Sequence, residues 1–271
     1  MDLNKNIEDF DLVFFDLETT GLDVVMGDAI CEIGAFKVKN RNVIDKFHTL
    51  INPQRNVSEE AYRIHKISSD DLKKAPDFKE IAKNLLLFLE NSIICTYNAA
   101  FDIGFLDYQL KKIDYEPLNL PTVDILLMAR DIINLPKYNL ETVANFFNID
   151  CSVGLHRALA DAFIASEVFF KLADIFKEKE IVKLDEFISL YGFGNEIYKI
   201  KENKKIDSLK AAIDNKLELT LKYFSVAKII EEGKAIPLRI FEENRSFYLL
   251  CQIKNECSRI KLSHILRVVT A

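Results

Sequence analysis

DLVFFDLETTGL, residues 11–22, is the stretch that decides how this chain begins to fold. The run 11–15 is short and apolar after its first acidic residue, which predicts a buried strand. Asp16 and Glu18 follow at the end of this strand. Because side chains alternate along a strand, both carboxylates point to the same side. Two like charges in a partly buried place repel each other, and a divalent cation between them would offset that repulsion.

An Asp-x-Glu pair is a weak signal by itself. The pattern is short and common, and a strand end with two solvated acids explains it better when nothing else is considered. Thr19, Thr20 and Gly21 continue the chain as a loop whose backbone amides are available to a substrate.

Two further segments carry acidic side chains at the ends of predicted elements. Asp102 follows the apolar run 92–97 and begins a helix, where a carboxylate also stabilises the helix dipole. His156 and Asp161 lie in HRALAD, and five helical residues separate them by about 140° beyond a full turn. This spacing fits a histidine before a helix and an aspartate within it. Taken singly, a helix cap and a surface acid explain these residues as well.

The three segments together favour a metal-dependent site. Four carboxylates and one imidazole stand at three element ends, namely Asp16, Glu18, Asp102, Asp161 and His156. Hard oxygen ligands suit Mg²⁺ or Mn²⁺ rather than zinc. Two such ions about 4 Å apart activate a water and stabilise the leaving oxygen of a phosphodiester. Histidine is the usual general base near neutral pH, so we expect His156 to take the proton from that water.

Three segments carry a more specific resemblance: FDLETTGL (15–22), YNAAFDIGFL (97–106) and LHRALADA (155–162). In order and separation they resemble the motifs of the DEDDh (DnaQ-like) family of 3′→5′ exonucleases. That family includes the epsilon subunit of bacterial DNA polymerase III and the exonuclease domain of PolC-type polymerases. The resemblance covers about residues 9–177 and implies a ribonuclease H-like fold. It also implies that the four carboxylates bind two metal ions and that His156 is the base.

The resemblance further implies a set of residues near a bound nucleotide. The segment 61–68, AYRIHKIS, resembles the family segment that lies near the terminal base, with Lys66 where a glycine is usual. The substrate-binding residues expected on these grounds are Thr19, Thr20, Gly21, Leu22, His65, Ile67, Asn98 and Phe101.

Periodicity along the chain predicts an α/β fold. Apolar and polar residues alternate in 29–39 and 43–51 around a turn at 40–42, which predicts an antiparallel pair of strands. Ser58 and Asp77 are typical helix caps. Helical spacing follows in residues 101–113, 123–133, 140–147 and 156–176. Strands first and alternating elements afterwards indicate a mixed sheet with helices on both faces.

The pattern changes from residue 209 to one helix and several strand-like runs, at 217–223, 235–241, 246–253 and 259–262. These segments resemble a WYL domain, a small β-rich module that binds nucleic acids or nucleotide-like ligands. Phe247, Tyr248 and Leu249 stand where the triplet that names the domain would be. A strand-rich packing or dimerisation domain is the alternative reading. The resulting division of the chain is an exonuclease domain (1–177), a charged helical linker (178–208) and a WYL-like domain (209–271).

The formal charge of −6 is unevenly distributed. Residues 201–271 contain 14 Lys and Arg against 9 Asp and Glu (+5), so residues 1–200 contain 22 against 33 (−11). An acidic domain that handles phosphates needs metal ions to contact them, whereas a basic tail can hold a polyanion directly. The candidate basic contacts of the tail are Lys222, Arg239, Arg245, Arg259, Lys261 and Arg267.

Other features limit the setting and the partners. Five cysteines without a CxxC pair argue against zinc and a disulfide framework, which favours a reducing cytoplasm. The sequence has no apolar run long enough to span a membrane and no signal-peptide pattern. We therefore expect a cytoplasmic enzyme that acts on nucleic acid with a 3′ end, with single-stranded DNA favoured. The alternatives are an RNA-trimming exonuclease and a nucleic-acid or nucleotide sensor dominated by the C-terminal domain. No segment marks a polymerase-binding site.

Overall fold

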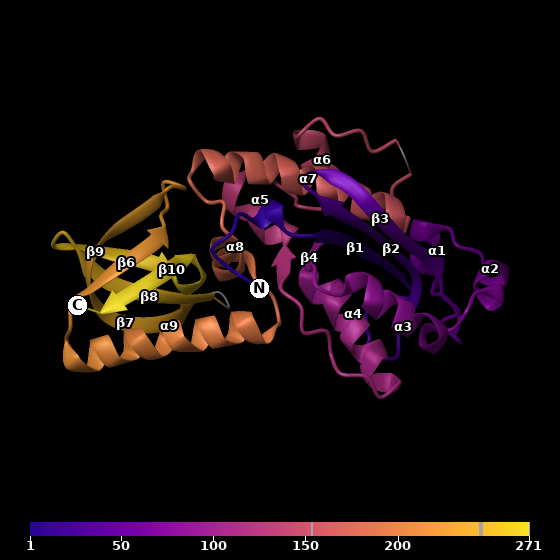
Figure 1. Ribbon diagram of the computed structural model, residues 1–271, viewed down its shortest axis with the longest axis horizontal. Coiled ribbons are helices and arrows are strands. Elements are labelled where there is room, and N and C mark those ends of the chain that lie inside the picture. The colour runs from indigo at the N-terminus through magenta and orange to yellow at the C-terminus, as the bar shows by residue number, and fades with distance from the viewer. Residues whose placement is uncertain (153, 244–245, 271) are drawn as a thin grey trace. The chain divides into compact units, whose positions relative to one another are not determined.

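The computed structural model describes residues 1–152, 154–243 and 246–270, and the chain divides into two compact units (Figure 1). One unit is Glu8–Ala173, and the other combines Met1–Ile7 with Asp174–Ala271. The charged segment 178–208 is grouped with the C-terminal sheet. The domain limits expected from the sequence stay a prediction.

A five-stranded mixed sheet in the order β3-β2-β1-β4-β5 is the centre of the first unit. Its strands are β1 (Leu12–Thr19), β2 (Ile30–Lys39), β3 (Asn42–Leu50), β4 (Ile93–Thr96) and β5 (Thr122–Asp124). β1, β2 and β3 are antiparallel, whereas β4 and β5 continue the sheet in parallel with β1. The turn between β2 and β3 places Asn40 and Arg41 at positive φ, as a tight hairpin requires. The predicted mixed sheet and antiparallel pair are confirmed.

Seven α-helices are described in or beginning in the first unit. They are α1 (Glu59–His65), α2 (Ser69–Lys74), α3 (Phe78–Leu89), α4 (Ala99–Lys112), α5 (Ile125–Ile132), α6 (Leu140–Phe146) and α7 (Ala158–Glu178). Both predicted caps are confirmed: Ser58 accepts a hydrogen bond from the N–H of Ala61, and Asp77 forms a capping box with Glu80. The sequence did not predict α2, and residues 123–124, expected in a helix, lie in β5.

Helices flank both faces of this sheet (Figure 1). On one face, the ring of Phe14 in β1 lies 5.4 Å from that of Phe169 in α7, measured between centroids. On the other face, Phe47 of β3 packs against Phe88 of α3 at 5.7 Å. The aromatic packing holds α7 along β1, so the start of α7 is directed to the end of that strand.

The start of α7 lies directly on β2 at Gly34. A Cβ atom on Gly34 would lie only 2.1 Å from the backbone nitrogen of Leu159, so a larger residue there requires the helix to shift. Gly34 is paired with Asp16 across the sheet, and Glu32 is paired with Glu18. Because opposite residues on neighbouring strands share a face, the helix start meets the same patch that carries the two acids of β1.

The second unit is β-rich, as expected. Its antiparallel sheet has the order β10-β6-β7-β8-β9. The elements are α8 (Leu184–Tyr191), α9 (Glu196–Asn215), β6 (Leu219–Phe224), β7 (Ile230–Glu243), β8 (Ser246–Ile253), β9 (Glu256–Lys261) and β10 (Ile265–Thr270). Leu209 and Ala212 of α9 pack into the core beside Leu221 and Leu249. The helix predicted after residue 209 is therefore the last part of α9, and β10 was not predicted.

Candidate active site

Asp16 and Glu18 of β1 form an acidic cluster with Asp161 of α7. One carboxylate oxygen of each lies within 4.8 Å of the others. Asp16 and Glu18 reach one side of the sheet because they are two residues apart on a strand. Asp161 reaches them because α7 begins on the same face, one turn earlier. Three convergent carboxylates are a suitable set of oxygen ligands for a hard divalent cation.

Asp102 contributes a fourth carboxylate from the first turn of α4. Its side chain is buried, and the hydroxyl of Thr96 donates a hydrogen bond to its Oδ2 at 2.6 Å. The charge of Asp102 raises the pKa of Asp16, so these two carboxylates are electrostatic neighbours. The placement follows from the topology, because β4 lies parallel to β1 and α4 begins where β4 ends.

His156 lies before α7 and Asp161 lies within it, as their spacing indicates. The backbone of His156 has a left-handed φ of 67°, and its N–H donates to both carboxylate oxygens of Asp161 at 3.2 and 3.3 Å. The histidine side chain is exposed. Its backbone is thus anchored to the acidic cluster while its ring faces solvent.

Burial and mutual repulsion raise the pKa values of the cluster. Burial raises the pKa of Asp16 well above its ordinary value, and the charges of Asp102, Asp161 and Glu18 raise it further. Burial and the charge of Asp161 raise the pKa of Glu18 to about 8. Burial also raises the pKa of Asp102 to about 7, against the hydrogen bond from Thr96, and the pKa of Asp161 to about 6. A cation would favour the ionised forms, so the cluster fits a metal site.

A cavity of about 470 Å³ lies beside Glu18. Five of the eight predicted substrate-binding residues line it: Thr19, Gly21, Leu22, His65 and Phe101. Its walls also include Leu17 and Ile64, so the cavity is largely apolar, and three acidic side chains share its lining. Such a composition suits a flat base next to a charged phosphate.

The other three predicted substrate-binding residues do not line this cavity. The hydroxyl of Thr20 donates to Asp28 and accepts from the N–H of Ala29, so it holds the loop after β1. Ile67 is buried in a small cluster with other apolar side chains. Asn98 precedes α4 with a left-handed φ of 78°.

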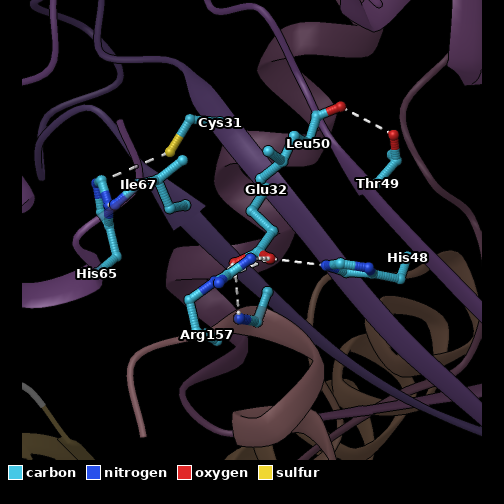
Figure 2. Close-up of polar contacts among 9 residues, drawn as sticks. Cys31, Glu32, His48, Thr49, Leu50, His65, Ile67 and Arg157 are labelled. Carbon is cyan, nitrogen blue, oxygen red and sulfur yellow. Dashed lines mark hydrogen bonds and ion pairs between the residues drawn. The ribbon is translucent and has the colours of Figure 1, made fainter. Parts of the chain in front are cut away.

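His65 is buried at the end of α1 (Figure 2). Its Nδ1 accepts a hydrogen bond from the N–H of Ile67 at 3.0 Å, and its Nε2 lies 3.9 Å from the sulfur of Cys31. Burial lowers the pKa of His65, so the ring is neutral at neutral pH. It shapes the cavity wall and carries no charge to it.

Sequence reasoning missed Glu32, which lies beside the acidic cluster. Its side chain is 0% exposed, and its carboxylate accepts hydrogen bonds from Arg157, His48 and the N–H of Ala158 (Figure 2). Burial alone would raise the pKa of Glu32, but these hydrogen bonds outweigh it and the pKa lies below its ordinary value. An acidic residue amid the apolar residues of β2 was the signal available in the sequence.

Comparisons with known proteins agree with this geometry. Residues 13–169 match the model of the family described as Exonuclease. The chain belongs to this family. It is a 3′→5′ exonuclease of the DEDDh type, a hydrolase that acts on nucleic acid, and the predicted enzyme class is confirmed.

Two curated relatives of different lengths show sequence similarity to the exonuclease. It is 43% identical over 166 residues to a DNA polymerase III subunit epsilon from Rickettsia conorii (strain ATCC VR-613 / Malish 7), which covers 59% of this chain and 72% of the relative. It is 35% identical over 187 residues to a PolC-type DNA polymerase III from Thermotoga petrophila (strain ATCC BAA-488 / DSM 13995 / JCM 10881 / RKU-1). That match covers 69% of this chain but only 14% of the polymerase.

Solved structures support the fold of the exonuclease. The nuclease domain of 3′hExo, a DEDDh family member, aligns with a TM-score of 0.55 at 15% identity, over 61% of this chain and 93% of that domain. The predicted ribonuclease H-like fold is therefore confirmed. Within residues 1–152, 154–243 and 246–270, none of the helices has the length and apolar character needed to cross a membrane.

The raised pKa values predict how the stability of the metal-free exonuclease depends on pH. The folded protein holds protons that the unfolded chain releases, so the contribution of the cluster is present below the ordinary carboxyl pKa. This contribution is lost as the pH rises from 4.5 toward about 8. We expect Tm in a chelator to fall over this window, to fall less in Glu18→Gln, and to recover in Mg²⁺ or Mn²⁺. Thermal unfolding measures this.

The exposed Glu90 provides a matched control. Glu90→Gln removes the same charge elsewhere in the unit and should keep the pH dependence of the parent protein. The opposite pH dependence would contradict the assignment of the cluster. In that case the Tm of the metal-free parent protein would rise over the same window, and the Tm of Glu18→Gln would not.

Proposed function

We propose that this exonuclease shortens single-stranded DNA from the 3′ end with two divalent cations, Mg²⁺ or Mn²⁺, held by Asp16, Glu18, Asp102 and Asp161. The observation that supports this proposal best is the convergence of these carboxylates, three of them within 4.8 Å of one another. Cations would relieve the repulsion that raises their pKa values. When bound, such cations supply an activated water and stabilise the charge that develops at the phosphate.

The residues around the cluster have separate tasks in this proposal. His156, exposed and anchored to Asp161 through its backbone, accepts the proton of the attacking water. Leu22 and Phe101 in the cavity wall contact the terminal base, and the backbone near Thr19 approaches the sugar and phosphate. The neutral His65 closes the wall, while Thr20, Gly21, Ile67 and Asn98 hold the segments that form it.

DNA is favoured over RNA because the curated relatives at 43% and 35% identity are both named as DNA polymerase III proteins. The same names favour DNA replication as the setting. RNA trimming is the alternative with the same chemistry, and the nuclease domain of 3′hExo was solved bound to rAMP. A matched pair of DNA and RNA substrates separates the two.

The proposal predicts the activity of His156→Ala on 3′-labelled single-stranded DNA in Mn²⁺. Turnover should fall about 10²–10⁴-fold, the usual contribution of a positioned base, because the attacking water loses its proton acceptor. Labelled RNA of the same sequence should be degraded more slowly than DNA by the parent protein. Both rates are measured by the release of labelled nucleotide.

Ser152→Ala is the matched control, because Ser152 is exposed in the segment before α7 and bonds only locally to Asp150 in the described contacts. It should retain the turnover of the parent protein. Near-normal turnover in His156→Ala would remove this histidine from the mechanism. Faster digestion of RNA than DNA would replace the proposed substrate.

A second function is favoured by one face of the C-terminal sheet. Register places Phe241 opposite Tyr248 and Tyr248 opposite Lys261, while Leu250 separates Arg239 from Arg259. Opposite residues share a face, so two aromatic rings and three cations gather there. We call these residues (Arg239, Phe241, Tyr248, Arg259 and Lys261) the aromatic–basic face.

Contacts within the aromatic–basic face are stacked. The rings of Phe241 and Tyr248 are 5.7 Å apart with an interplanar angle of 25°. Cζ of Arg259 lies 3.8 Å from the ring centroid of Tyr248, and Cζ of Arg239 lies 5.3 Å from that of Phe241. Arg259 is also paired with Glu243, so the alternative reading is an arginine that only stabilises the sheet.

We propose that the aromatic–basic face binds single-stranded nucleic acid. Aromatic rings and guanidinium planes stack on bases, and cations contact phosphates, largely without sequence preference. Of the other candidates, Lys222 is paired with Glu186 and lies opposite Arg267, and Arg245 lies outside the described residues. The WYL-like character of this domain and a nucleotide-like ligand there stay predictions.

Removing two cations from this face should weaken binding to long single strands. In Arg239→Gln/Arg259→Gln, affinity for a long oligonucleotide should fall and the slope of log affinity against log salt should become shallower, because fewer counter-ions are released. Cleavage of very short substrates should not change. Fluorescence anisotropy at two salt concentrations in a chelator measures the affinity.

Lys204→Gln/Lys210→Gln, which removes two exposed charges of α9 outside the aromatic–basic face, controls for net charge. If both double variants weaken binding equally, the effect is general electrostatics. If neither does, the face only stabilises the sheet, and a small ligand or a second copy of the chain becomes the better partner for this domain.

A further inference from the structure

We propose that Glu32 is a positioning residue that holds the backbone around His156 in place for catalysis, through the side chain of Arg157 and the N–H of Ala158. This inference rests on the proposed role of His156 as the base. It concerns a residue whose carboxylate oxygens accept hydrogen bonds from the protein itself.

Glu32 is a fully buried carboxylate, and its hydrogen-bonding capacity is used by the protein. Oε1 accepts from Nη2 of Arg157 at 2.6 Å and from Nε2 of His48 at 2.7 Å. Oε2 accepts from the N–H of Ala158 at 3.1 Å, and Nε of Arg157 is shared between the two oxygens at 3.1 Å. An ionised carboxylate only accepts hydrogen bonds, so Nε2 of His48 carries a proton here.

This saturation distinguishes Glu32 from the metal-binding carboxylates. Glu32 stands opposite Glu18 across the β1–β2 pair, close enough for its charge to act on the cluster. Its two oxygens nevertheless accept hydrogen bonds from Arg157, His48 and the N–H of Ala158 (Figure 2). A cation would have to displace these donors to bind it. Glu32 therefore stabilises neighbouring segments of the protein and does not serve as a metal ligand in this inference.

The contacts of Glu32 converge on the residues that follow His156. Ala158 is the first residue of α7, so its N–H has no partner within the helix and Glu32 supplies one. Arg157 is next to His156 and is held by two nitrogens of its guanidinium, which fixes its orientation as well as its position. The backbone of His156 is fixed from the other direction by the carboxylate of Asp161.

The rest of α7 does not depend on Glu32. Gly34 lets the backbone of Leu159 lie directly on β2, and Phe169 packs against Phe14 further along. Loss of the Glu32 contacts would therefore loosen the segment before the helix while α7 and Asp161 stay in place. The expected defect is in the placement of the histidine and not in the metal ligands.

A double-mutant cycle between Glu32 and His156 tests this at saturating Mn²⁺ on single-stranded DNA. Glu32→Gln should lower kcat about 10- to 100-fold, the usual effect of losing a partner that supports a site, with a smaller change in KM. In the His156→Ala background, the same substitution should produce little further loss, because the two residues act in one step. Asp45→Asn, which removes the same charge at an exposed position of the neighbouring strand β3, is the matched control.

Hydrogen exchange of the segment 155–161 provides a readout besides activity. Exchange there should be faster in Glu32→Gln than in the parent protein, because the N–H of Ala158 loses a charged acceptor. Exchange in β1 should not change. If Glu32→Gln does not fold, Arg157→Lys replaces it in the same cycle, since lysine keeps the charge but cannot make the two-nitrogen contact.

Each outcome decides between separate claims. If the effects of Glu32→Gln and His156→Ala multiply, Glu32 has a general structural role and the inference fails while the proposed function stands. If a higher Mn²⁺ concentration restores the kcat of Glu32→Gln, Glu32 is a metal ligand and the inference also fails. If His156→Ala alone retains turnover, His156 is not the base, and the inference that rests on that role fails with it.

Discussion

Repulsion among buried carboxylates is the constraint on which the rest of this exonuclease depends. Asp16, Glu18, Asp102 and Asp161 are gathered where burial alone raises their pKa values, and several raise one another further. A folded chain gains nothing from such a group unless a positive charge compensates it. The cluster therefore fits a set of ligands for a divalent cation. The charge of the neighbouring Glu32 is instead compensated within the protein, because Arg157 forms an ion pair with it and His48 donates a hydrogen bond to it.

The sheet topology brings these groups together from distant parts of the sequence. β1 supplies two acids at its end, and the parallel neighbour β4 ends where α4 begins with a third. α7 supplies the fourth because Gly34 admits its backbone directly against β2. The aromatic contact of Phe14 with Phe169 then fixes the direction of α7. The Phe14–Phe169 contact and the absence of a side chain at Gly34 thus position the start of α7, which carries Asp161.

Local patterns predicted much of this structure, and long-range contacts account for what was missed. Alternation predicted β2 and β3, and the caps Ser58 and Asp77 predicted two helix starts. The same alternation did not single out Glu32, whose side chain is fully buried because both faces of β2 are covered there. Its partners Arg157 and Ala158 are about 125 residues away, a distance that no local pattern spans. β10 was missed because its apolar residues do not alternate with polar ones, and α2 because its six residues include a single apolar one.

Calorimetric titration of Mn²⁺ into the metal-free protein, compared with Asp16→Asn, tests the central claim most directly. Asp16 is the residue whose pKa responds to all the other carboxylates of the cluster, so its neutral substitute should disrupt the site without removing volume. The account predicts that the parent protein binds Mn²⁺ with release of protons, and that Asp16→Asn binds it far more weakly with less proton release. Equal binding by the two proteins, or none by a parent protein that digests DNA in a chelator, would contradict it.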